Sequence, residues 1–181
     1  TGDSSESVSI GTGISGTAIT IGHTTSETTV SDNLTVTGDL AVNGDTTTFT
    51  SANSTDPLLI IKNTTNDANG ARFHFVKDKG AAGADGDDIG VIDFIADDAA
   101  QTQTTFARII AEVSESADTD EAGKLSFFVA ESDGTNTALA AGLVLEGEHA
   151  TDGEVDVTIA AGAASTTTIA GTLTMGSTAA M

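Results

Sequence analysis

Six apolar runs of strand length, all between Asp56 and Gly147, most constrain the fold of this chain. Each run is bounded by Gly, Asn, Asp or Ser, which favour turns, and its β-branched and aromatic residues favour strands. All but one of the seven Phe residues lie in this stretch. The pattern predicts a small antiparallel β domain over residues 56–147, with strands at Pro57–Lys62, Ala71–Lys77, Ile89–Ala96, Thr105–Val113, Lys124–Ala130 and Leu139–Leu145.

The run Thr105–Val113 fits two kinds of secondary structure. Its largest apolar residues recur at helical spacing, yet its side chains also alternate as in a strand. The turn-rich segment Ser114–Gly123 then leads into Lys124–Ala130, whose alternation is that of a strand. We favour a strand for Thr105–Val113, because the two runs then form a hairpin.

The flanks of this domain consist of short alternating aliphatic pairs separated by Gly or Asx. The clearest repeat is six residues long, Asn33–Gly38 followed by Asp39–Gly44, and the same texture returns at Val155–Ile159, Thr167–Ile169 and Leu173–Met175. Such pairs indicate short strands joined by tight turns. A repeat this small cannot close a core by itself, so its copies must stack or intertwine. The competing interpretation of the N-terminal flank is a disordered Ser/Thr linker.

The sequence therefore predicts an all-β protein in which elongated, fibrous β-repeat shaft segments, residues 1–55 and 148–181, flank a small antiparallel domain. Aromatic residues make up only 4% of the chain, so its core is thin and self-association is expected to supply burial. We expect an intertwined homotrimer, with six aliphatic residues packed between chains: Ile19, Ile21, Leu34, Val36, Leu40 and Val42.

The charge of the chain disfavours two classes of partner. Its formal net charge is -21, which repels nucleic acid and anionic lipid surfaces.

The chain contains no Cys, so neither disulfides nor thiolate metal sites hold the fold. No apolar run is long enough to suggest membrane insertion, and no leader is visible. Because the chain begins at Thr1, we expect it to be a piece of a longer protein.

Two acidic loops are the candidate metal sites. Asp85, Asp87 and Asp88 follow a Gly-rich segment, and Asp118 and Asp120 precede Glu121. Closely spaced carboxylates suit Ca²⁺, but neither loop has the ligand series of an EF-hand. We favour solvated turns, the first of them a hairpin tip, and no bound cofactor, with calcium as the alternative.

No catalytic motif is apparent. The three His residues lie in no metal-binding pattern. Four carboxylates of the central domain offer candidate pairs for glycoside hydrolysis, but the chain has no Trp or Tyr to receive sugar rings, so we expect no enzymatic activity. These residues are Asp93, Asp97, Asp98 and Glu112.

Three segments resemble the tail-fibre proteins of tailed bacteriophages, especially marine ones. They are Thr28–Gly44, Asp56–Gly70 and Ala107–Val113 with the acidic turn and Gly123–Phe127 that follow it. The resemblance implies a homotrimeric, elongated, β-rich virion fibre directed towards the host surface. It implies partners among other virion tail proteins, and a host glycan or protein bound through another part of the fibre. No catalytic residue carries over.

Two other classes of function stay open at this point. One is a subunit of a secreted bacterial adhesin or extracellular filament, stabilised by calcium at the acidic loops. The other is a polysaccharide-degrading tailspike. The expected location is the virion, with an extracellular location as the alternative.

Overall fold

The computed structural model describes residues 21, 28–148 and 153–174. The chain divides into two compact units, Thr1–Leu59 and Ile60–Met181. In the first unit, the described residues form neither helix nor strand. A strand requires a hydrogen-bonding neighbour, and within the described part of this unit the pairs Leu34/Val36 and Leu40/Val42 have none in one chain. Their expected pairing between chains stays a prediction.

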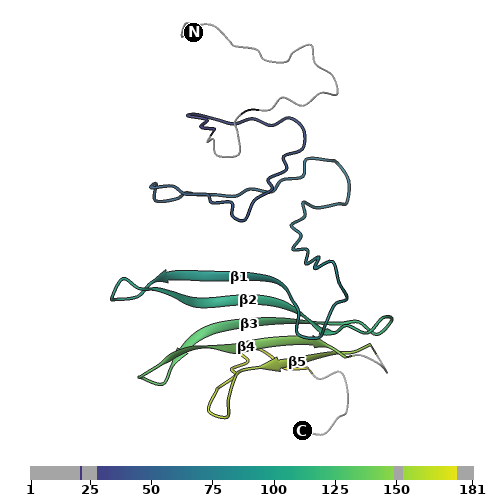
Figure 1. The fold of residues 1–181 in the computed structure, drawn as a ribbon. Coiled ribbons are helices and arrows are strands. Elements are labelled where there is room, and N and C mark those ends of the chain that lie inside the picture. Colours follow the sequence, from purple (N-terminus) through teal and green to yellow (C-terminus); the bar gives the residue numbers. More distant parts are fainter. Residues whose placement is uncertain (1–20, 22–27, 149–152, 175–181) are drawn as a thin grey trace, which may run out of the picture. The chain divides into compact units, whose positions relative to one another are not determined.

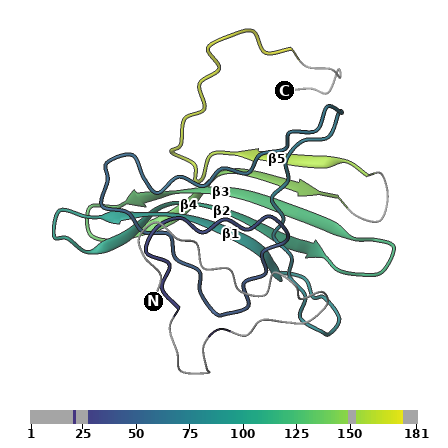
Figure 2. The ribbon, with the colours of Figure 1, turned by 90° about the horizontal axis from the view of Figure 1, so that it is seen from above.

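The second unit is built on one antiparallel sheet of five strands in the order β1-β2-β3-β4-β5. The strands are β1 (Asp88–Asp97), β2 (Gln103–Glu115), β3 (Ala122–Ser132), β4 (Thr137–Gly147) and β5 (Val155–Ile159). Consecutive strands run side by side in both views (Figures 1 and 2). The all-β prediction is confirmed, since the described residues include no helix.

The strand interpretation of Thr105–Val113 is confirmed. This run lies inside β2 and forms a hairpin with β3, in which Ile109 is opposite Phe127. Tertiary pairing decided between helix and strand, because alternate residues of β2 face opposite sides of the sheet.

The predicted strands Pro57–Lys62 and Ala71–Lys77 are wrong for the single chain, since both segments lack regular secondary structure. Among the described strands β1 pairs only with β2, and neither segment joins its free edge. The alternation within the second segment still places Phe73 and Phe75 together, with ring centroids 4.7 Å apart and planes at 86°. Phe75 lies directly against Gly90 of β1, where an added Cβ would come within 2.7 Å of the Phe75 Cβ.

The sheet also extends into the segment that the sequence assigned to the C-terminal shaft. Val155–Ile159 forms β5 and pairs with β4, so that Val157 is opposite Leu145. Thr167–Ile169 and Leu173 form no strand, and Met175 lies outside the described residues.

Side chains and backbone conformation close the turns of the sheet. Asp98 accepts hydrogen bonds from the amides of Ala100 and Thr102 between β1 and β2. Asp133 does the same for Thr135 and Asn136 between β3 and β4. In this second turn Gly134 has a φ of +89°, which side chains disfavour.

The second unit lacks an apolar core of its own among the described residues. No hydrophobic side chain of the described chain is buried, and only Ser126 is, at 2% exposure. A single sheet without a covering layer leaves both of its faces open to water. Folding in isolation would therefore bury far less apolar surface than a domain of this length requires.

Candidate functional site

The proposed trimer core is exposed wherever the structure describes it. The exposed fractions are 70% for Ile21, 67% for Leu34, 43% for Val36, 67% for Leu40 and 61% for Val42. Ile19 lies outside the described residues. Aliphatic side chains with this exposure are available for contact with another chain, and their packing in a trimer core stays a prediction.

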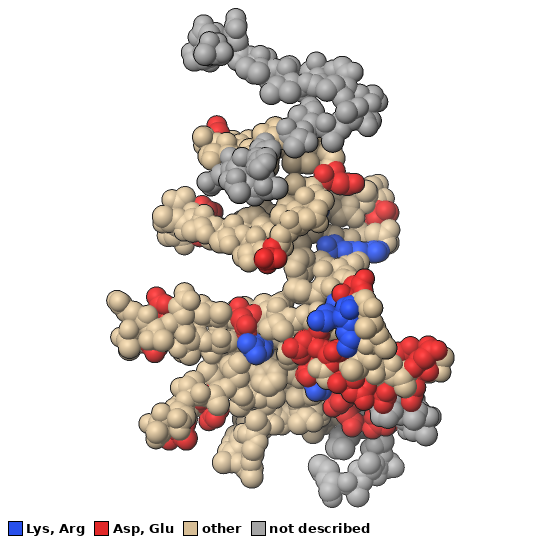
Figure 3. Space-filling model, viewed as in Figure 1, with Lys and Arg blue, Asp and Glu red and all other residues tan. Residues whose placement is uncertain are grey.

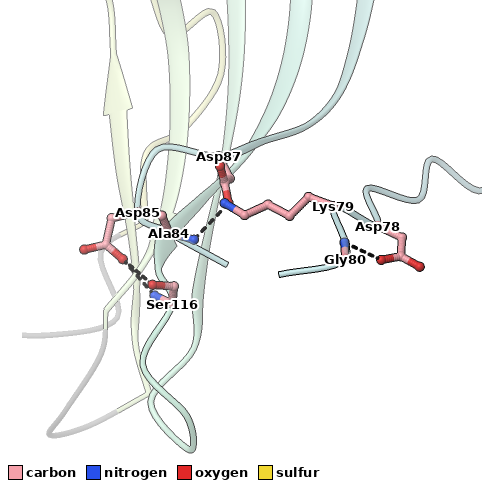
Figure 4. Close-up of polar contacts among 7 residues, drawn as sticks. All are labelled: Asp78, Lys79, Gly80, Ala84, Asp85, Asp87 and Ser116. Atoms are coloured by element: carbon pink, nitrogen blue, oxygen red, sulfur yellow. Dashed lines mark hydrogen bonds and ion pairs between the residues drawn. The ribbon is translucent and has the colours of Figure 1, made fainter. Parts of the chain in front are cut away.

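The acidic loop before β1 is held by protein donors (Figure 4). The Lys79 Nζ lies 2.6 Å from a carboxylate oxygen of Asp87, and the Ala84 amide donates to that same oxygen at 2.8 Å. The Lys79 hydrogen bond, followed by that of Ala84, holds the pKa of Asp87 below its usual range. Asp87 therefore acts as the anchor of its own loop.

Asp85 joins the same loop to the β2–β3 turn. Its carboxylate accepts hydrogen bonds from the Ser116 amide at 2.9 Å and from the Ser116 hydroxyl at 2.8 Å (Figure 4). The backbone of Gly86 and Asp87 also pairs with Val113 of β2. The loop is thus packed along the end of β2. It is not the hairpin tip that the sequence predicted, because Ala71–Lys77 is not a strand.

The other acidic segment lies in a turn, as expected. Asp118 and Asp120 lie between β2 and β3, where the Asp120 amide donates to the Ala117 carbonyl. Asp88 stands at the start of β1, opposite Glu112. Acidic side chains gather with a few basic ones at this end of the sheet, on the right in Figure 3. Within the described ranges, no group of three or more His, Asp or Glu side chains has the arrangement of a metal site.

Three of the four carboxylates that the sequence offered for hydrolysis have structural partners. Asp93 receives two hydrogen bonds from Arg108, at 2.7 Å from Nε and 3.1 Å from a terminal nitrogen. Arg108 holds the pKa of Asp93 below its usual range, the opposite of what a general acid needs. Glu112 pairs with Lys124 at 3.2 Å, and Asp98 closes a turn. Asp97 ends β1.

Sequence reasoning missed the partners of Asp85, Asp87 and Asp93. Lys79, Arg108 and Ser116 carried no motif, and strand register is what places Arg108 opposite Asp93. The only signal in the sequence was the opposite charge of two residues on neighbouring predicted strands.

The described part of the chain has no helix with the length and apolar character that a membrane crossing requires. Comparison of the chain with known protein families, curated proteins and solved structures found no significant match.

Proposed function

We propose that this chain is a structural segment of a bacteriophage tail fibre that assembles as a homotrimer and supports attachment of the virion to the host cell surface. The proposal combines the resemblance of three segments to tail-fibre proteins with the exposure of apolar side chains. That exposure carries the most weight: in the described residues no hydrophobic side chain is buried. A chain of this kind needs other chains to complete its core.

The role of the chain in this proposal is mechanical. Leu34, Val36, Leu40 and Val42 pack between copies, and closed threefold symmetry satisfies strand edges that would otherwise aggregate. Other tail proteins bind the ends of the fibre, and another part of the fibre contacts the host glycan or protein. The carboxylates stabilise turns and strand pairs, and the chain catalyses no reaction.

Mass spectrometry of purified virions tests the location. We expect peptides of this chain in the particles, together with a trimeric mass of the purified protein in sedimentation at micromolar concentration. A stable folded monomer contradicts the homotrimer. Filaments of indefinite length in electron micrographs would instead favour the extracellular filament.

Chelation separates the fibre from a calcium-stabilised adhesin. We expect EDTA to leave the melting temperature unchanged, because Asp85 and Asp87 already bind Ser116 and Lys79. Calcium bound only by the folded state would raise stability, and chelation would remove that gain. Release of reducing sugar from host polysaccharide would favour the tailspike, and we expect none.

A further inference from the structure

The strand register separates the sheet into two chemically different faces. On one face, each cross-strand row is apolar, and we name this set the apolar face. One row joins Ile92, Ile109, Phe127, Leu143 and Ile159, and the next joins Gly90, Ala111, Leu125, Leu145 and Val157. A third joins Phe94, Ala107, Val129 and Ala140. No charged side chain interrupts these three rows.

The opposite face is mixed: rows with charged side chains lie beside the row of Val91, Ile110, Ser126 and Val144. It carries the ion pairs of Asp93 with Arg108 and of Glu112 with Lys124, together with Glu146 opposite Asp156. It also holds Ser126, the one buried residue in the described ranges. The two faces thus differ in charge: the ion pairs lie on the mixed face, and the three rows of the apolar face contain no charged side chain.

We propose that the apolar face is the surface on which copies of this chain pack against one another. This inference deepens the proposed function and rests on it for the number of copies. It places the main contact on the sheet, in addition to the repeat residues near the N-terminus.

The apolar face approaches the size of a specific interface. Five strands about 4.8 Å apart and three rows about 6.8 Å apart span on the order of 500 Å² in projection. The relief of the side chains raises the accessible area above that value, towards the roughly 800 Å² per partner of a specific interface. Sheets that pack face to face in this way lie about 10 Å apart.

A second copy is the partner that fits this face. The described residues include no buried apolar side chain, so the chain needs whatever covers this face in order to fold. Identical copies are present wherever the chain is made. Interfaces between permanent subunits are the most apolar class. A net charge of -21 makes the other surfaces of two copies repel each other. Phe75 already covers the face at Gly90, so the rest is left for another chain.

Two neighbouring residues of β5 provide a matched test. Val157 is on the apolar face and 56% exposed in one chain, whereas Thr158 is exposed on the opposite face, opposite Val144. The V157K and T158K variants add the same charge to the same strand. We expect sedimentation of V157K to show association at least tenfold weaker than that of the natural chain, and T158K to associate normally. Equal association of V157K and the natural chain would overturn the proposal.

A milder pair of variants covers the case in which V157K does not fold. The natural chain has no Cys, so V157C and T158C each carry a single thiol. In the assembled protein we expect a maleimide reagent to modify V157C at least tenfold more slowly than T158C. Equal rates in the assembled protein would mean that the apolar face is not the contact between copies, and would not affect the proposed virion location. Absence of the chain from virions would remove the fibre function but leave protection of V157C as evidence for this surface.

Discussion

The absence of a side chain at Gly90 lets Phe75 pack against the sheet. Gly90 lies in β1 on the apolar face, and Phe75 occupies the space that a side chain would need. A Cβ there would lie 2.7 Å from both the Cβ and the Cγ of Phe75, closer than such atoms approach. These atoms lie at the base of the aromatic side chain, so a rotation of the ring cannot relieve the overlap.

Replacement of Gly90 by a residue with a side chain should therefore destabilise the fold. We expect G90V to lower the free energy of unfolding by about 1–3 kcal/mol, as overpacking does, in urea titrations of the assembled protein. G70V is the matched control, because a Cβ at Gly70 meets nothing within 4 Å. Equal stability of the two variants would mean that Phe75 does not rest on β1.

The pair Asp93–Arg108 predicts a pH dependence. Arg108 lowers the pKa of folded Asp93, while the unfolded carboxyl titrates near about 3.9. A lowered folded pKa contributes stability that is present above the unfolded pKa and lost as pH falls through the folded pKa. In unfolding titrations, the difference in free energy of unfolding between the natural chain and D93N should be constant above about pH 5 and shrink below about pH 4. The difference between the natural chain and R108Q should shrink over the same pH range. A difference that persists to the lowest pH would contradict this.

At the scale of elements, the six-residue repeats carry the clearest prediction. If Asn33–Gly44 packs between copies, the V36D variant places a carboxylate from each chain in one narrow core. An unpaired buried charge costs several kcal/mol, and the copies repel each other. We expect V36D to remain unassembled in sedimentation at micromolar concentration. T37D adds the same charge one residue along, on the other side of an alternating segment, and should assemble. Assembly of both variants would make the repeats a linker.

The elements also show how far the sequence predicts the fold. Alternation identified β1, β2, β3 and β4, because each run is long, apolar and bounded by turn residues. It overpredicted Pro57–Lys62 and Ala71–Lys77, since a run with strand composition becomes a strand only beside a partner. It placed Val155–Ile159 in the shaft, because nothing in five residues indicates that β4 has a free edge.

The polar contacts were harder to predict than the strands. Arg108 meets Asp93 only because of the register of β1 on β2. Asp85 meets Ser116 across 31 residues of sequence, through a loop whose path no motif specifies. The sequence offered these carboxylates as candidate metal ligands or hydrolytic groups, and the structure gives them protein partners.

At the scale of the whole molecule, high negative charge and an uncovered apolar sheet act in opposite directions on assembly. Every copy brings a net charge of -21, so each added chain meets repulsion from those already present. Burial of apolar side chains favours association and is not weakened by added salt. The balance between the two therefore depends on ionic strength.

Salt should strengthen assembly. The screening length falls from about 30 Å at 0.01 M salt to about 10 Å at 0.1 M, which removes most of the repulsion between copies and leaves the apolar contact intact. We expect the association constant from sedimentation, and the melting temperature of the assembled protein, to rise between 0.01 M and 0.5 M NaCl. V157K is a useful comparison, since its association should stay weaker than that of the natural chain at every salt concentration. If assembly instead weakened as NaCl increased, ion pairs between copies, and not the apolar face, would hold the chains together.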